Sequence, residues 1–314
     1  MDNPFALDYR EPETDDASVS AHVGEAVAAP EFATGVQRLP SAIYHGDPAP
    51  MPSLSATLAK LIVGKSPRHA WYASPRLNPD WVSNDRKTFD IGRAAHRAIL
   101  GCGDDYVAIP QEVLASNGAA STTAAKLFIA DARERGVTPL KEDEVAQIER
   151  MRDIAKERLA QHGIELDPTR SELSAIAEMD GIWCRAMFDN VPADPAQPIY
   201  DFKTCEDASP AACLRAILNY GYDIQAEHYR AVWKEVTGEE RKFVFIFQEK
   251  SEPNEVTLVA LSGSFQDAGQ TRAARARRLW GECINSNNWP GYPVGLHEVD
   301  APAWLLERTF QEEM

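Results

Sequence analysis

Hydrophobic positions recur along this chain with two different periods. In the N-terminal half they follow helical spacing, which predicts three helices, over residues 52–72, 88–101 and 142–163. Ser53 is placed to cap the first of these helices, and Gly101 and Gly163 close the other two. We therefore expect the first half of the folded region to be largely helical.

After residue 171 the pattern changes to short runs typical of strands, separated by two further helical segments. The expected elements are a hairpin about the turn EMDG at 172–191, a strand at 198–205, helices at 210–221 and 223–238, strands at 242–250 and 255–262, and a closing helix at 265–285. This order predicts one α/β domain, with a central mixed β-sheet flanked by helices and a helical N-terminal part.

The N-terminal segment has a different composition from the rest of the chain. Residues 1–40 are acidic, rich in Ala, Pro and Ser, and show little periodicity, so we expect a flexible tail followed by one domain over residues 41–314. Residues 1–31 contain eight acidic side chains and one basic side chain, a large part of the net charge of -16. This imbalance suggests the hypothesis that the tail mimics DNA and inhibits the domain, and the alternative is a solubilising arm.

Composition also excludes several classes of protein. The hydrophobic content of 44% and the charged content of 25% are those of a globular protein, and no apolar run approaches the roughly 20 residues of a membrane helix. The N-terminus lacks the order of a secretion signal, so a cytoplasmic protein is expected. The five cysteines are scattered and form no CxxC pair, which argues against a zinc knuckle, a disulfide framework or an iron–sulfur cluster.

Candidate chemistry centres on the stretch QPIYDFKTCED, where Asp201 and Lys203 lie two apart at the expected end of a strand and so on the same face. Asp189 ends the second strand of the hairpin. If these strands are neighbours, two carboxylates converge, which favours a Mg²⁺ or Mn²⁺ ion with the Phe202 carbonyl as a further oxygen ligand. Lys203 would then position the attacking water. A buried Asp–Lys ion pair without a metal remains the alternative.

Gln225 and Tyr229 follow about twenty residues later, four apart and therefore on one helix face. Such a pair usually reflects packing. Its position after a D-x-K tripeptide makes it a candidate part of the same site.

The chain contains, in this order, Glu172, GIWCRAMFD, DFKT and QAEHY. This series of motifs resembles the PD-(D/E)XK nuclease superfamily, and most closely its branch of phage exonucleases related to RecE, exonuclease VIII. The segment GRAAHRAIL resembles the helix of that branch that carries a metal-facing histidine, here His96, and WPGY has a counterpart near the end of many members. The resemblance covers roughly residues 40–295.

The resemblance implies a role for each matched residue. Asp189 and Asp201 would bind a divalent metal, with His96 as a ligand or hydrogen-bonding neighbour. Glu172 is the preferred candidate for a further acidic residue that assists the metal site. The other candidates, Glu178 and Asp180, fall at the hairpin turn.

Three further roles follow from the same resemblance. Lys203 would orient or activate the attacking water, and Gln225 and Tyr229 would support Lys203 and the scissile phosphate. The acid two residues before Lys203 is Asp rather than the commoner Glu, a change that keeps the charge.

The activity implied by the resemblance is Mg²⁺-dependent digestion of linear double-stranded DNA from 5′ to 3′, for recombination by strand annealing. A ring-shaped homo-oligomer, a single-strand annealing protein as partner, and a bacterial or phage-infected cell are implied as well. Two alternatives stay open: an endonuclease or repair nuclease of the same superfamily, and an inactive DNA-binding or scaffold module.

Two segments are candidates for DNA contact. Arg272, Arg275 and Arg278 form a basic stripe on the last expected helix, which could contact phosphates or simply be solvated. Trp71 and Tyr72 could stack on bases, although core packing is the simpler role for Trp71.

Overall fold

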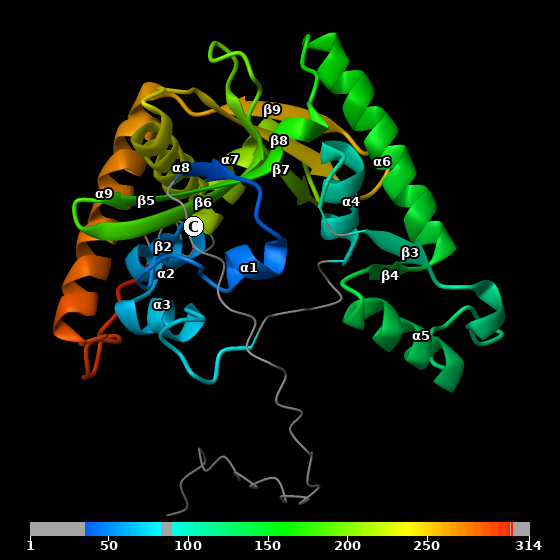
Figure 1. Ribbon diagram of the computed structural model, residues 1–314, viewed down its shortest axis with the longest axis horizontal. Coiled ribbons are helices and arrows are strands. Elements are labelled where there is room, and N and C mark those ends of the chain that lie inside the picture. The colour runs from blue at the N-terminus through cyan, green and yellow to red at the C-terminus, as the bar shows by residue number, and fades with distance from the viewer. Residues whose placement is uncertain (1–34, 83–89, 104, 302, 304–314) are drawn as a thin grey trace, which may run out of the picture. The chain divides into compact units, whose positions relative to one another are not determined.

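The computed structural model describes residues 35–82, 90–103, 105–301 and 303. Within them a seven-stranded mixed sheet runs in the order β1-β5-β6-β7-β8-β9, with β2 paired to β6, and a small second sheet is formed by β3 and β4 (Figure 1). The strands are β1 (Gly35–Gln37), β2 (Leu54–Ser55), β3 (Tyr106–Ala108), β4 (Thr138–Leu140), β5 (Ser171–Met179), β6 (Ile182–Asn190), β7 (Ile199–Cys205), β8 (Phe243–Glu249) and β9 (Val256–Ala260).

Helices cover both faces of the large sheet (Figure 1). They are α1 (Ser41–His45), α2 (Ala56–Gly64), α3 (Pro67–Ala73), α4 (Asp90–Leu100), α5 (Thr123–Glu134), α6 (Glu142–Gln161), α7 (Pro210–Tyr220), α8 (Tyr222–Thr237) and α9 (Gly263–Ser286). The predicted α/β fold with a central mixed sheet is therefore confirmed. None of the described helices combines the length and the apolar character needed to cross a membrane.

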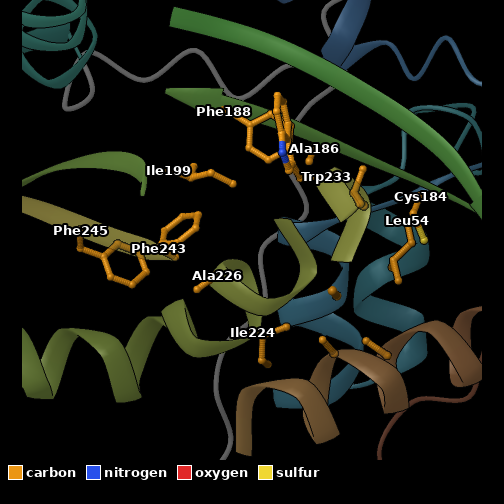
Figure 2. Packing of buried hydrophobic residues seen from close by; sticks show 14 of the residues in the cluster. Leu54, Cys184, Ala186, Phe188, Ile199, Ile224, Ala226, Trp233, Phe243 and Phe245 are labelled. Carbon is orange, nitrogen blue, oxygen red and sulfur yellow. The ribbon is translucent and has the colours of Figure 1, made fainter. Parts of the chain in front are cut away.

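Two hydrophobic cores lie on opposite faces of the sheet. The larger core joins α2, α8 and α9 to β5 and β6, and Figure 2 shows Phe188, Trp233 and Ile224 within it. The smaller core joins α4 and α6 to Tyr200 and Phe202 of β7. Because side chains alternate along a strand, Asp201 and Lys203 point toward α8 while their neighbours point toward α4.

The helix predicted over residues 52–72 with Ser53 as its cap is wrong, because the chain forms two helices there, α2 and α3. Pro67 has no N–H to continue the hydrogen bonds of α2, and it occupies the first turn of α3, where none is needed. Ser55 caps α2, with its Oγ accepting from the amide of Leu58 at 3.3 Å. The hydroxyl of Ser53 instead donates to Asp47 Oδ1 at 2.6 Å.

Two other boundaries differ from the sequence expectation. Strand β7 continues to Cys205, so Asp201 and Lys203 lie within the strand rather than at its end, because β8 pairs with it in register as far as Glu249. Strand β1, which pairs with β5, falls within the predicted tail of residues 1–40, while residues 1–34 of that tail lie outside the described part.

Candidate active site

The hairpin of β5 and β6 brings two acidic residues together. Ser171 pairs with Asn190 and Leu173 with Phe188, so Glu172 lies opposite Asp189. Asp180 and Gly181 at the turn have φ of 53° and 76°, as a two-residue type I′ turn requires, and this turn fixes the register. Glu178 pairs with Trp183 at the other end of the hairpin, so both it and Asp180 lie far from Asp189.

Strand β7 supplies the acid and the base. The Nζ of Lys203 forms an ion pair with Oδ1 of Asp201, whose side chain is only 2% exposed. The other oxygen, Oδ2, accepts from Gln225 Nε2 of α8 at 2.8 Å. The ion pair confirms that the two β7 side chains share a face, and Gln225 contacts the carboxylate rather than the lysine.

Asp189 connects β6 to β7 and α4. Its Oδ2 accepts from the backbone N–H of Phe202 at 2.6 Å and lies 2.9 Å from Nε2 of His96. The other ring nitrogen of His96, Nδ1, lies 3.8 Å from Oε1 of Glu172. His96 is thus held between two carboxylates from neighbouring strands.

Glu172 occupies an unusual backbone position. Its φ of 50° is uncommon for a residue other than glycine, and such conformations cluster at functional sites. Gly103, at φ 111°, lies so close that an added Cβ would come within 2.8 Å of Oε1 of Glu172. The glycine therefore leaves room for this carboxylate beside His96.

Electrostatics of the site follow from burial and from close opposite charges. Burial raises the pKa of Asp201 to about 6, with a contribution from Asp189, while Lys203 opposes the rise. Burial alone would lower the pKa of His96, but the Asp189 and Glu172 carboxylates raise it to about 10. At neutral pH the unliganded site thus holds ionised Asp201 and protonated His96.

Two cavities of about 450 Å³ each open onto these residues. Both are lined by His45, His96, Glu172, Met187 and Lys203. The first extends past Arg93, Thr204 and Tyr222. The second extends past Ser55, Trp81 and Tyr229. Together they offer room for an extended substrate beside Lys203.

The donor set fits a divalent cation. Within the described ranges, no three His, Cys, Asp or Glu side chains are already spaced as a formed metal site. In this arrangement Lys203 and His96 contact the carboxylates of Asp201 and Asp189. Yet Oδ1 of Asp201 is buried and accepts no well-directed hydrogen bond from the described residues. A buried carboxylate oxygen beside a second carboxylate is a ligand suited to Mg²⁺ or Mn²⁺.

The remaining predicted residues lie nearby. Phe202 is buried, and its ring is 6.0 Å from that of His96, while its backbone N–H holds Asp189. Tyr229 lines the second cavity, and its ring packs 5.2 Å from that of Phe188. Burial raises the pKa of Tyr229 well above its usual range, so its hydroxyl stays protonated.

The predicted basic stripe on α9 is partly neutralised within the protein. Arg272 pairs with Asp223 at 2.6 Å, and Arg278 pairs with Glu282 at 2.8 Å. A role of this stripe in DNA contact therefore stays a prediction that rests chiefly on Arg275. Trp71 is half-buried and Tyr72 is 63% exposed.

Sequence reasoning missed the residues that the N-terminal helices contribute. His45 of α1 lines both cavities, and Lys60 of α2 lies 5.3 Å from the ring centre of Tyr222. Neither residue belongs to a recognisable motif, and Lys60 sits in a helical pattern where a lysine normally indicates a solvated face. Only the contact of α2 with α8 reveals its position.

Comparison with known families fits this geometry. The profile of a family described as "PDDEXK-like domain of unknown function (DUF3799)" matches residues 62–298, well over half of the chain. The chain belongs to this family. The match spans every residue discussed above as a candidate ligand or catalytic group, so these residues lie within the PDDEXK-like domain.

A solved structure of similar fold is known. The PDDEXK-like domain is similar to the crystal structure of a "putative exonuclease" from Eubacterium rectale, with a TM-score of 0.56 and 14% identity over 87% of this chain and 98% of that one. A phage-related exonuclease from Haemophilus somnus 129PT matches at a TM-score of 0.29 and 15% identity, over 62% of this chain and 95% of the other. A search of curated proteins gave no significant match.

Proposed function

We propose that this protein is a metal-dependent exodeoxyribonuclease that hydrolyses phosphodiester bonds of linear double-stranded DNA. The observation that carries the proposal is the convergence of Asp189, Asp201 and Lys203, with His96 and Glu172, on one cavity. Carboxylates that can hold a divalent ion, beside a lysine that can stabilise negative charge, are suited to metal-assisted phosphodiester hydrolysis. The choice of an exonuclease acting from 5′ to 3′ rests on the motif resemblance to the RecE branch.

In this proposal Asp189, Asp201 and the Phe202 carbonyl hold a divalent ion, with His96 and Glu172 at its edge. The ion, when bound, supplies a Lewis acid for the phosphate oxygens, and Mn²⁺ can replace Mg²⁺. Asp201 would hold the ion through its buried Oδ1, the atom that forms the ion pair with Lys203.

The protein's own groups have separate tasks. Gln225 fixes the Asp201 carboxylate through its hydrogen bond of 2.8 Å, and the Phe202 amide does the same for Asp189 at 2.6 Å. The Lys203 ammonium, whose pKa burial would lower but Asp201 and Asp189 raise, stays charged. It orients the attacking water and stabilises negative charge on the phosphate in the transition state.

The deciding experiment compares linear duplex DNA, labelled at either end, with covalently closed circles in the presence of Mg²⁺ or Mn²⁺. We expect the linear DNA to be degraded from its 5′ ends while the circles survive. Cutting of circles would instead favour an endonuclease or repair nuclease. Failure to cut either substrate with both metals would favour a binding or scaffold module.

The same resemblance supports two wider proposals: a role in recombination by strand annealing with an annealing protein, and a ring-shaped homo-oligomer. Sedimentation measurements on the full chain would test the oligomer. A single monomeric species at micromolar concentration would remove it from the proposal.

Gly103→Ala tests the place of Glu172 in the site. The new Cβ would meet Oε1 of Glu172 at 2.8 Å and should displace this carboxylate from His96. We expect hydrolysis to slow by about tenfold or more. Gly136→Ala is a matched control, because Gly136 also has a positive φ, of 72°, but no atom within 4 Å of the added Cβ. Equal activity of the two variants would argue against a role for Glu172.

A further inference from the structure

Two lysines from different parts of the chain share one aromatic ring at the edge of the site. The Nζ of Lys203 lies 5.2 Å from the ring centre of Tyr222, and the Nζ of Lys60 lies 5.3 Å from the same centre. Tyr222 opens α8 and lines the first cavity. Cation–π contact of this kind stabilises a lysine that has lost part of its hydration.

The position of Lys60 depends on the glycine that precedes this tyrosine. Gly221 has φ of 63°, and an added Cβ would come within 3.2 Å of Cγ of Lys60. The aliphatic stem of Lys60 therefore runs closely over the start of α8 and carries its ammonium to the Tyr222 ring. This is a defined placement rather than that of a freely solvated surface lysine.

The two ammonium groups differ in their partners. Lys203 forms an ion pair with Asp201. No carboxylate of the described residues lies within ion-pair distance of Lys60. Burial and, to a smaller extent, the charge of Lys203 lower the pKa of Lys60 to about 8, although Asp201 opposes both effects. A half-buried cation that lacks an acidic partner is costly to maintain, and an anionic ligand would compensate its charge.

We propose that Lys60 binds a phosphate of the DNA strand being cut, next to the scissile phosphate. The inference rests on the proposed nuclease function, because a DNA strand presents one anionic phosphate for each nucleotide. The scissile phosphate belongs beside Lys203, because the Asp201 carboxylate holds this lysine in the site. Lys60 reaches the same Tyr222 ring from a different element, α2, and does not share the Asp201 ion pair, so we assign it to a neighbouring phosphate rather than to the scissile one.

The test measures binding of labelled duplex DNA to the full chain in EDTA, so that affinity is measured without hydrolysis. Lys60→Met should weaken binding by about tenfold, and Lys60→Arg should restore most of the loss, since a charge-assisted hydrogen bond is removed and then replaced. Lys65→Met is the matched control, because Lys65 lies at the exposed end of the same helix, and it should change affinity less than twofold.

A second arm locates the phosphate. Single phosphates near either end of the DNA are replaced, one at a time, by uncharged methylphosphonates. At the phosphate that Lys60 contacts, the replacement should weaken wild-type binding about tenfold and should not weaken Lys60→Met binding further. If every replacement costs both proteins the same factor, Lys60 contacts none of these phosphates and the inference is overturned.

Thermal unfolding separates this role from a structural one. Loss of an unpaired, half-buried charge should leave the melting temperature of Lys60→Met unchanged or higher. A lower melting temperature together with unchanged affinity would make Lys60 a structural residue and overturn the inference. If the wild type neither binds nor cuts DNA, the proposed function fails as well. If the wild type does both and Lys60→Met matches it, only the role of Lys60 fails.

Discussion

Replacement of Lys203 by alanine is expected to reduce hydrolysis of linear DNA by about 10³-fold. The ammonium is the one cationic group that forms an ion pair with the buried carboxylate of Asp201 in the described part of the chain. It is therefore the group best placed to stabilise charge on the phosphate. The rate should be measured as kcat and KM separately, and the fall is expected in kcat, because the contact strengthens in the transition state.

Lys203→Ala should also lower the free energy of unfolding when no metal is bound. Without Lys203, the Asp201 carboxylate, 2% exposed, loses its ion-pair partner, which costs about 3 kcal/mol of unfolding free energy in EDTA. Activity is therefore compared at a temperature where circular dichroism shows the variant to be folded.

Lys234→Ala is the control for that comparison. It removes an exposed ion pair with Glu240 and should leave both rate and stability nearly unchanged. Wild-type kcat in a folded Lys203→Ala protein would leave Asp201 and Lys203 as a structural pair.

The parts of the site carried by strands could be predicted because alternation along a strand is strict. Asp201 and Lys203 had to share a face, and the Asp180–Gly181 turn set the hairpin pairing. Glycines also marked helix ends correctly, as at Gly101, which follows α4 with φ of 72°. These features depend on local backbone chemistry that a single sequence displays.

The pairing register of β5 with β6 was needed to decide which of the three acids of the hairpin lies at the site. Glu172, Glu178 and Asp180 were all candidates, and the motif resemblance favoured Glu172. Pairing of Ser171 with Asn190 places Glu172 beside Asp189, while pairing of Glu178 with Trp183 places that acid at the far end. Each residue along a strand adds about 3.4 Å, so Glu178 and Asp180 lie several residues of strand away from Asp189.

Contributions from distant segments could not be predicted. Lys60 reaches the site because α2 packs against α8, and His45 of α1 lines both cavities; such long-range placements leave no periodic signal. The strands β3 and β4, which lie between predicted helices, also went unrecognised, because strands of three residues carry too few positions for a pattern. Helix α5 was not predicted either.

Mg²⁺ or Mn²⁺ is expected to raise the melting temperature of the wild type, and Asp201→Asn should abolish this rise. A ligand that binds only the folded state adds about 2.7 kcal/mol of stability at a concentration one hundred times its dissociation constant. The ion would replace the Lys203 and His96 cations as the partner of Asp201 and Asp189. Asparagine keeps the shape of Asp201 and its contact with Gln225, but removes the charge that binds the ion.

The shift should also depend on pH, with a direction that the site fixes. A metal requires His96 neutral and Asp201 ionised. Although burial lowers the pKa of His96, the Asp189 and Glu172 carboxylates outweigh it and raise this pKa to about 10. Protons therefore compete with the metal, and the stabilisation should grow as pH rises from 6 toward 9. Glu178→Gln, which removes an acid at the far end of the same hairpin, should respond to metal as the wild type does. A metal shift in Asp201→Asn equal to that of Glu178→Gln would place the ion elsewhere and remove Asp201 from the ligand set.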